Sequence, residues 1–260
     1  MMKILISNDD GYEAPGIIAL FNSLKDIAEV FVIAPAENMS GAGSSLTANQ
    51  PIQISEKENG FYAVSGTPVD CVFLGVRELC PFKPDMVVSG INKGANMAED
   101  LRYSGTVGAA FEGEELDLPS IAVSAAILKG GEGPEQEPNY ESAALVARNL
   151  VLKIRDLKID SKLTLNVNVP NLPYDQIKGI KTTSIGTWGP RNPPERTENS
   201  QEYLVTHRDK RPHNDESTDI ATVYRGEVSI STIKPNFLHR EEIEKEQNKF
   251  DLEISRWLEK

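Results

Sequence analysis

The pattern that most constrains the fold is a strand, a helix and a second strand at the start of the chain. Residues 3–7 are an apolar run typical of a buried strand, and residues 29–34 are a second such run. Between them, Pro15 suits the first position of a helix, and apolar residues then recur at helical spacing as far as Ile27. This order makes a βαβ unit, which predicts a parallel sheet with helices packed on its faces.

The same alternation continues and predicts an α/β fold with a Rossmann-like, doubly wound and mostly parallel sheet. Further strands are expected at residues 84–90, 120–124 and 163–169, and helices at residues 67–76, 103–112 and 140–157. Residues 51–55 and 60–65 flank an Asn-Gly turn and predict a β-hairpin inserted into this pattern. In the helix that begins at Thr67, Asp70 is expected to have a structural role.

The composition changes after Pro170, where the regular alternation of strands and helices ends. Residues 186–218 contain Trp188, several prolines and mixed charges, a pattern typical of an exposed arm. Beyond the arm, the sequence predicts paired strands at residues 219–226 and 227–233 and a charged amphipathic helix at residues 240–260.

An arm and a terminal helix that a core does not need usually pack against something, and a second subunit is the expected partner. We therefore expect a homo-oligomer, either a dimer or a tetramer. The chain is expected to form a single α/β domain over residues 1–260. Its core would span about residues 1–185, and a C-terminal oligomerisation arm and helix would span about residues 186–260.

Charge and composition exclude several classes of function. The chain has 39 acidic and 27 basic residues and a formal net charge of -12, which argues against a nucleic-acid polymer or an anionic membrane as a partner. Only three histidines are present, so the chemistry is expected to depend on oxygen ligands. Cys71 and Cys80 form no CxxC pair and fit a reduced compartment. Without a signal segment or a run near ~18 apolar residues, the protein is expected to be cytoplasmic.

Polar residues follow several of the predicted strands at the point where each strand ends. Asp9 and Asp10 follow the first strand, and Asn92 and Asn96 follow a later one. Ligands of open α/β sheets bind outside the carboxyl ends of the strands. Two adjacent carboxylates raise each other's pKa, so a hard divalent cation is the favoured compensation. In the alternative, the two aspartates only cap a turn before the helix that begins near Pro15.

Two glycine-containing segments are candidates for an anion site. Ser40 and Gly41 lie in a small, polar loop, where backbone N–H groups can approach an anion. Ser104, Gly105 and Thr106 begin a predicted helix, whose N-terminus offers unpaired N–H groups. The alternatives are a flexible surface loop and ordinary N-capping by Ser104 or Thr106. If the helix start holds a phosphate, Gly105→Ala is expected to keep or raise stability and to abolish turnover.

Several motifs in a fixed order are more specific than any one of them. They are Ser7-Asn8-Asp9-Asp10-Gly11 with Ala14-Pro15-Gly16, Ala34-Pro35 with Ser40-Gly41 and Ser45-Leu46-Thr47, Gly66-Thr67-Pro68-Val69-Asp70-Cys71-Val72, Val88-Ser89-Gly90-Ile91-Asn92 with Gly94 and Asn96, and Tyr103-Ser104-Gly105-Thr106-Val107. Together they resemble the SurE (survival protein) family of metal-dependent nucleotidases. The resemblance is dense over residues 3–125 and looser beyond, where residues 166–170 and 218–219 still match.

This resemblance implies a Rossmann-like fold, one divalent ion per subunit (Mg²⁺ or Mn²⁺) and removal of phosphate from nucleoside 5′- or 3′-monophosphates. It also allows cleavage of short polyphosphates. By the family pattern, the metal ligands would be Asp9, Asp10, Ser40 and Asn92. The phosphate would be held by Gly41, Asn96, Ser104, Gly105 and Thr106, and the catalytic residues would be Asp9 and Asp10.

The chemistry of these residues is consistent with that implication. Carboxylate, hydroxyl and amide oxygens are hard donors that suit Mg²⁺ or Mn²⁺. A metal-bound water would attack phosphorus in line, and Asp9 is the expected base. A route through an aspartyl-phosphate is disfavoured because the carboxylates are adjacent instead of spaced by one residue. From another class, the chain could be a nucleotide-binding sensor without turnover. A dehydrogenase is excluded because no GxGxxG follows the first strand.

Overall fold

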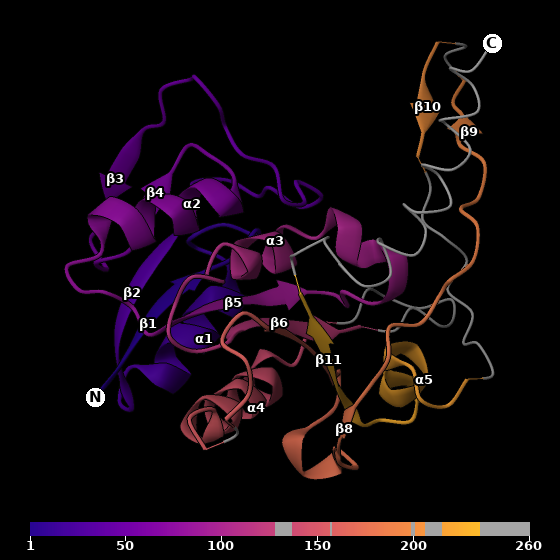
Figure 1. Cartoon of the computed structure of the whole chain (residues 1–260). Helices are drawn as coiled ribbons and strands as arrows, with labels where there is room; N and C mark the ends of the chain where they lie inside the picture. The colour runs from indigo at the N-terminus through magenta and orange to yellow at the C-terminus, as the bar shows by residue number, and fades with distance from the viewer. Residues whose placement is uncertain (128–136, 157, 199–200, 206–214, 235–260) are drawn as a thin grey trace, which may run out of the picture.

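Nine strands form one mixed sheet in the computed structural model, which describes residues 1–127, 137–156, 158–198, 201–205 and 215–234 (Figure 1). From one edge to the other, the strands are β3 (Ile54–Glu56), β4 (Tyr62–Val64), β2 (Ala28–Pro35), β1 (Met2–Ser7), β5 (Met86–Lys93), β6 (Ser120–Ala126), β7 (Thr164–Pro170), β11 (Val228–Ile233) and β8 (Ile180–Thr182). All neighbours from β4 to β7 pair in parallel. The antiparallel pairs are β3 with β4 and β11 with β7. The prediction of a mostly parallel sheet with an inserted hairpin is confirmed.

Helices cover both faces of the sheet, as a doubly wound fold requires. The helices are α1 (Pro15–Leu24), α2 (Pro68–Leu74), which continues as a π-helical turn (Gly75–Leu79), α3 (Gly105–Phe111), α4 (Tyr140–Lys153) and α5 (Asp219–Tyr224). Two short 3₁₀ helices, η2 (Ala98–Tyr103) and η3 (Tyr174–Gln176), complete the set. Figure 1 shows α1 and α4 on one face of the central strands and α2 and α3 on the other.

Strand β1 lies between the two layers of helices and is apolar on both sides. Ile4 and Ile6 belong to the core cluster that contains the buried residues of α1 and α4. Leu5 points the other way, into the cluster that contains the buried residues of α2. Because successive side chains of a strand point to opposite faces, a strand covered on both faces reads as a continuous apolar run. This double burial explains why residues 3–7 are recognisable as a strand from the sequence.

The prediction of a strand at residues 219–226 is wrong, because Asp219–Tyr224 form helix α5. The Thr218 hydroxyl accepts a hydrogen bond from the Ala221 N–H at 3.3 Å and so caps the start of α5. The β-branched residues of this segment favour a strand locally, but Ile220 and Val223 are three positions apart and both are buried. Val228–Ile233 is the expected strand, but it pairs with β7 and β8 and not with residues 219–226.

The arm expected from residue 186 onward includes a small hairpin. Strands β9 (Glu195–Arg196) and β10 (Tyr203–Leu204) pair in antiparallel fashion and stand clear of the main sheet in Figure 1. The helix expected at residues 240–260 lies outside the described residues. No helix in the described part of the chain is both long enough and apolar enough to cross a membrane.

Candidate active site

The turn after β1 is built by Asn8, which leaves Asp9 and Asp10 without a capping role. The Asn8 side-chain amide donates to the Gly11 carbonyl at 2.9 Å, and its Oδ1 accepts from the Gly11 N–H at 3.2 Å. Helix α1 begins after Ala14, which makes no side-chain capping bond. The turn-capping alternative for the two aspartates is therefore not what the structure shows.

Asp9 is buried, with 3% of its surface exposed, and its nearest polar partner is on α3. Its Oδ1 accepts a hydrogen bond from the Thr106 hydroxyl at 2.5 Å. Burial raises the pKa of Asp9 to about 6, the Thr106 hydroxyl opposes that rise, and the charge of Asp10 adds to it. A carboxyl group in this state can exchange protons close to neutral pH and would gain from a cation beside it.

Asp10 is less buried than its neighbour and faces the end of β5. Its Oδ2 accepts a hydrogen bond from the Lys93 backbone N–H at 3.1 Å. Burial raises the pKa of Asp10, and the Lys93 N–H and ammonium both oppose that rise. The two adjacent carboxyl groups thus both have raised pKa values, which is the signature of insufficient compensation of negative charge.

The structure brings Asn92 to the same edge as the two aspartates. Strands β1 and β5 are parallel neighbours, with Ser7 opposite Ser89. Strand β5 is longer than predicted and runs to Lys93, so Asn92 lies within its last residues, next to the Lys93 N–H that bonds to Asp10. The Asn92 side-chain amide donates to the Gly94 carbonyl at 3.0 Å. This bond uses the nitrogen of the amide and leaves the oxygen as the atom that can serve as a ligand.

The loop that carries Ser40 and Gly41 is attached at two points to the residues around Asp9. The Met39 N–H donates to the Asp9 carbonyl at 2.7 Å, and the Gly43 N–H donates to the Tyr103 carbonyl at 3.1 Å. Ser40 and Gly41 are exposed between these points, and no atom lies within 4 Å of where a Gly41 Cβ would be. The loop thus lies next to the carboxylates with open space beside Gly41.

The first turn of α3 contacts Asp9 through the Thr106 hydroxyl, a contact that the sequence did not predict. The Ser104 hydroxyl accepts from the Val107 N–H at 3.1 Å, which is the ordinary N-cap given as an alternative above. Thr106 is fully buried and its hydroxyl bonds to Asp9, so this hydroxyl orients the carboxylate. The prediction that residues 104–106 contact a phosphate stays a prediction.

Gly105 is required where α3 comes closest to Asp9. A Cβ at Gly105 would lie 2.7 Å from the Asp9 Cβ, 2.9 Å from its Oδ2 and 3.1 Å from the Pro68 Cγ. An alanine would therefore push against the Asp9 carboxylate. The expectation that Gly105→Ala keeps stability does not fit this geometry, and loss of activity in that variant would not by itself identify a phosphate site.

Asn96 is held by two asparagines of β7 that the sequence analysis did not assign to the site. The Asn168 Oδ1 accepts from the Asn96 N–H at 2.8 Å, and the amides of Asn166 and Asn168 both donate to the Asn96 carbonyl at 2.9 Å. The Asn96 amide donates to the Ser124 hydroxyl at 2.9 Å. The sequence does contain a hint of this role. Asparagines alternate with apolar residues in β7, which is buried throughout, and buried amides need hydrogen-bond partners.

The set of oxygen donors fits a hard divalent cation. In the described part of the chain, no three His, Cys, Asp or Glu side chains come together as a group that could hold a metal. A cation at this edge would therefore use the two carboxylates with neutral oxygens, and the Asn92 amide and the Ser40 hydroxyl supply oxygens of that kind next to them.

Comparison with known proteins places this arrangement in context. The family model described as "Survival protein SurE" matches residues 4–192. The chain is 50% identical over 186 residues to "5'-nucleotidase SurE" of Legionella pneumophila strain Lens, covering 72% of this chain and 71% of the relative. The protein of the same description from strain Corby matches to the same extent. The crystal structure of the SurE protein from Aquifex aeolicus is similar with a TM-score of 0.82 and 38% identity, over 96% of this chain and 99% of that one.

Proposed function

This chain belongs to the SurE family, and from that premise we propose that it is a metal-dependent 5′-nucleotidase. It hydrolyses nucleoside 5′-monophosphates to nucleoside and phosphate. The observation that carries the proposal is the pair of adjacent carboxyl groups, Asp9 and Asp10, whose pKa values are both raised at the edge where β1 and β5 end. Such a pair supports a role in binding a cation and not a purely structural role.

In this proposal, one Mg²⁺ or Mn²⁺ per subunit is held by Asp9, Asp10, Ser40 and Asn92. When bound, the ion supplies positive charge to the phosphoryl oxygens and acidifies water. Asp9 accepts the proton of the attacking water. The bound ion lowers the pKa of a carboxylate that holds it, so Asp9 is ionised at neutral pH and able to accept that proton. The Thr106 hydroxyl holds the carboxylate in place for that step.

The phosphate is proposed to lie between the Gly41 loop and the start of α3. The open space beside Gly41 and the attachment of its loop to Tyr103 support this placement. Gly41, Asn96, Ser104, Gly105 and Thr106 remain the proposed contacts. The Thr106 hydroxyl donates its proton to Asp9, whereas the Ser104 hydroxyl only accepts from the Val107 N–H. The Ser104 O–H and the backbone N–H groups of this segment are therefore the preferred donors.

Hydrolysis of 3′-monophosphates and of short polyphosphates is a further part of the proposal, and the resemblance to the family is its only support. The second candidate function is a nucleotide sensor without turnover. The 50% identity to two proteins described as 5'-nucleotidases favours the enzyme.

A phosphate-release assay separates the two candidates. Nucleoside 5′- and 3′-monophosphates of each common base are incubated with the protein in chelator, in Mg²⁺ and in Mn²⁺. The enzyme proposal expects phosphate in the metal lanes alone. Full activity in excess chelator would contradict the metal, and nucleotide binding without phosphate release in every lane would favour the sensor.

A homo-oligomer, dimer or tetramer, is also proposed, with residues 186–260 in the interface. Tyr203, Leu204 and Val205 of the arm are 57%, 59% and 75% exposed, which is a run of apolar surface that association would cover. Light scattering at micromolar protein tests this, and the mass of one 28.6 kDa chain would contradict it. We propose the cytoplasm as location, in accord with the free thiols of Cys71 and Cys80, and no partner among nucleic-acid polymers or membranes.

A further inference from the structure

Asp219 is a fully buried carboxylate to which no function has been given above. It is the first residue of α5 and has 0% of its surface exposed. Its carboxylate accepts three backbone N–H groups from three segments. Oδ2 accepts from Ala98 at 2.9 Å, and Oδ1 accepts from Gly186 at 2.8 Å and from Ile220 at 2.8 Å. One side chain thus joins the end of the β5 loop, the base of the arm and the start of α5.

Only a carboxylate can satisfy these three donors together. Its two oxygens accept on both sides, whereas an asparagine has one oxygen and an NH₂ group that donates. In Asp219→Asn, an amide that keeps the Gly186 and Ile220 bonds must place its NH₂ against the Ala98 N–H. The substitution therefore removes one bond selectively, the bond to the β5 loop.

The Ala98 end of this contact leads directly into the proposed phosphate site. Ala98 follows Asn96 by two residues and begins η2, which ends at Tyr103, just before Ser104. Its φ of +53° lies in the left-handed region, where a residue other than glycine needs support from its surroundings. The Asp219 carboxylate supplies that support at the residue where the chain turns.

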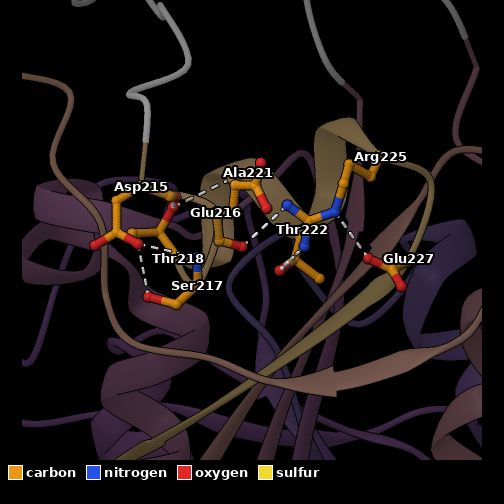
Figure 2. Close-up of polar contacts among 8 residues, drawn as sticks. All are labelled: Asp215, Glu216, Ser217, Thr218, Ala221, Thr222, Arg225 and Glu227. Carbon is orange, nitrogen blue, oxygen red and sulfur yellow. Dashed lines mark hydrogen bonds and ion pairs between the residues drawn. The ribbon is translucent and has the colours of Figure 1, made fainter.

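The segment that carries Asp219 is held by several hydrogen bonds, and Figure 2 shows those among eight of the residues from Asp215 to Glu227. The Thr218 hydroxyl caps α5 and donates to the Asp215 carbonyl at 3.0 Å. Arg225 donates to the Glu216 carbonyl at 2.9 Å and to the Glu227 carboxylate at 3.0 Å. Met97, Ala98, Ile220 and Val223 also pack in one apolar cluster. Asp219 therefore acts from a rigid base.

We propose that Asp219 is a positioning residue for the phosphate-binding segment of residues 96–104. It acts through the Ala98 N–H, sets the path of the chain between Asn96 and Ser104, and does not touch the substrate or the metal. This inference rests on the proposed function, because it assumes that Asn96 and residues 104–106 hold the phosphate. A merely structural Asp219 would affect stability and leave substrate affinity unchanged, which is the distinction to test.

The test compares Asp219→Asn with Thr218→Ala, a matched control in the same helix. The control removes the bond from the Ala221 N–H to the Thr218 hydroxyl that caps α5 (Figure 2). It leaves the carboxylate of Asp219 and its bond to Ala98 in place. For Asp219→Asn we expect KM for a nucleoside 5′-monophosphate and the inhibition constant of inorganic phosphate to rise about tenfold or more, the effect of losing a hydrogen bond to a charged group. The Mn²⁺ concentration for half-maximal activity is expected to stay as in the parent.

For Thr218→Ala we expect a lower Tm with KM and the phosphate inhibition constant unchanged. The proposal is overturned if folded Asp219→Asn keeps the parental KM, or if the control raises KM equally. A parent that releases no phosphate would instead refute the proposed function.

If Asp219→Asn cannot be purified, hydrogen exchange of the parent decides the matter. Phosphate added with Mn²⁺ should slow exchange of the Ala98 amide, because opening this contact would release the ligand. An unchanged exchange rate overturns the proposal.

Discussion

Two buried aspartates, Asp9 after β1 and Asp70 at the start of α2, have similarly little exposed surface but pKa values shifted in opposite directions. They are 3% and 2% exposed. Asp70 accepts from the Thr67 N–H at 2.7 Å, the Thr47 N–H at 2.9 Å and the Thr47 hydroxyl at 2.6 Å. Burial raises the pKa of Asp70, but these bonds outweigh it and leave the pKa below its usual value. Asp9 has the Thr106 hydroxyl and a carboxylate neighbour, and its pKa is about 6.

In this pair, Asp70 lies less deep among protein atoms than Asp9 and has more hydrogen-bond donors, and these two differences together separate the structural aspartate from the candidate site. Asp70 completes a capping box with Thr67 and is fully provided with donors, so it needs no ligand. Asp9 still lacks compensation, which a cation would provide. The opposite pKa shifts also predict how the contribution of each aspartate to stability depends on pH. The contribution of Asp70 to stability is present above pH 3.8 and is lost as the pH falls through its lower folded pKa.

For Asp9 the sign is reversed. Its folded pKa is raised from 3.8 to about 6, so its contribution is fully present below pH 3.8 and is lost as the pH rises through about 6. The metal-free protein therefore carries an uncompensated charge at neutral pH.

The largest effect is expected from Asp10→Asn. Removing one carboxylate from the proposed metal site should reduce kcat/KM by about 10³-fold or more, the scale of ~4 kcal/mol of lost transition-state stabilisation. Phosphate release in saturating Mn²⁺ measures it, with circular dichroism as the control for folding. A variant with near-parental activity would show that Asp10 is no closer to the chemistry than Asp70.

A second test asks whether Asp9 destabilises the protein when no metal is bound. In chelator at pH 7, Asp9→Asn should raise the free energy of unfolding by up to about 3 kcal/mol, because a neutral amide replaces a buried charge. The gain should vanish near pH 4, where Asp9 is protonated in the parent. Denaturant unfolding at both pH values measures it, and an equal gain at both would contradict the assigned cause.

Asp70→Ala should have the opposite profile. Loss of the capping box and of the Thr47 bonds should lower the free energy of unfolding by about 2 kcal/mol. The activity per folded molecule should not change. Asp26→Ala, which breaks an exposed ion pair with Arg148, is the control and should lower the free energy of unfolding by less than Asp70→Ala does. An Asp70→Ala variant that is stable but inactive would contradict the conclusion that Asp70 is structural and Asp9 belongs to the site.

The smallest effect is expected from Thr106→Val, which removes the hydroxyl on Asp9 at nearly constant volume. Because that hydroxyl lowers the pKa of Asp9, its loss should move the acid limb of the kcat/KM profile to higher pH. Activity on the plateau should fall about tenfold, since one hydrogen bond to a charged group is lost. Thr106→Ser, which keeps the hydroxyl, should retain the parental limb. An unmoved limb in Thr106→Val would show that Asp9 is not the group that titrates.

Much of the fold could be predicted because its signals are local. The strands that are covered on both faces read as continuous apolar runs, and each helix start carries its own cap or proline. The meeting of Asp10 with the end of β5 also followed, since neighbouring parallel strands end at the same edge of the sheet. Residues 219–226 were predicted wrongly because their β-branched residues favour a strand, and their helical state depends on burial against distant segments.

The sequence by itself therefore determined the order of the elements, the doubly wound sheet and the residues that gather at its carboxyl edge. Only the tertiary structure decided which of those residues act on one another. Thr106 is 97 positions from Asp9, and Ala98 is 121 positions from Asp219. Hydrogen bonds of this kind depend on the path of the whole chain, whereas periodicity and capping depend on a few consecutive residues. For this reason the sequence predicted which polar residues lie at the ends of the strands, but it did not predict the hydrogen-bond partners of the buried carboxylates.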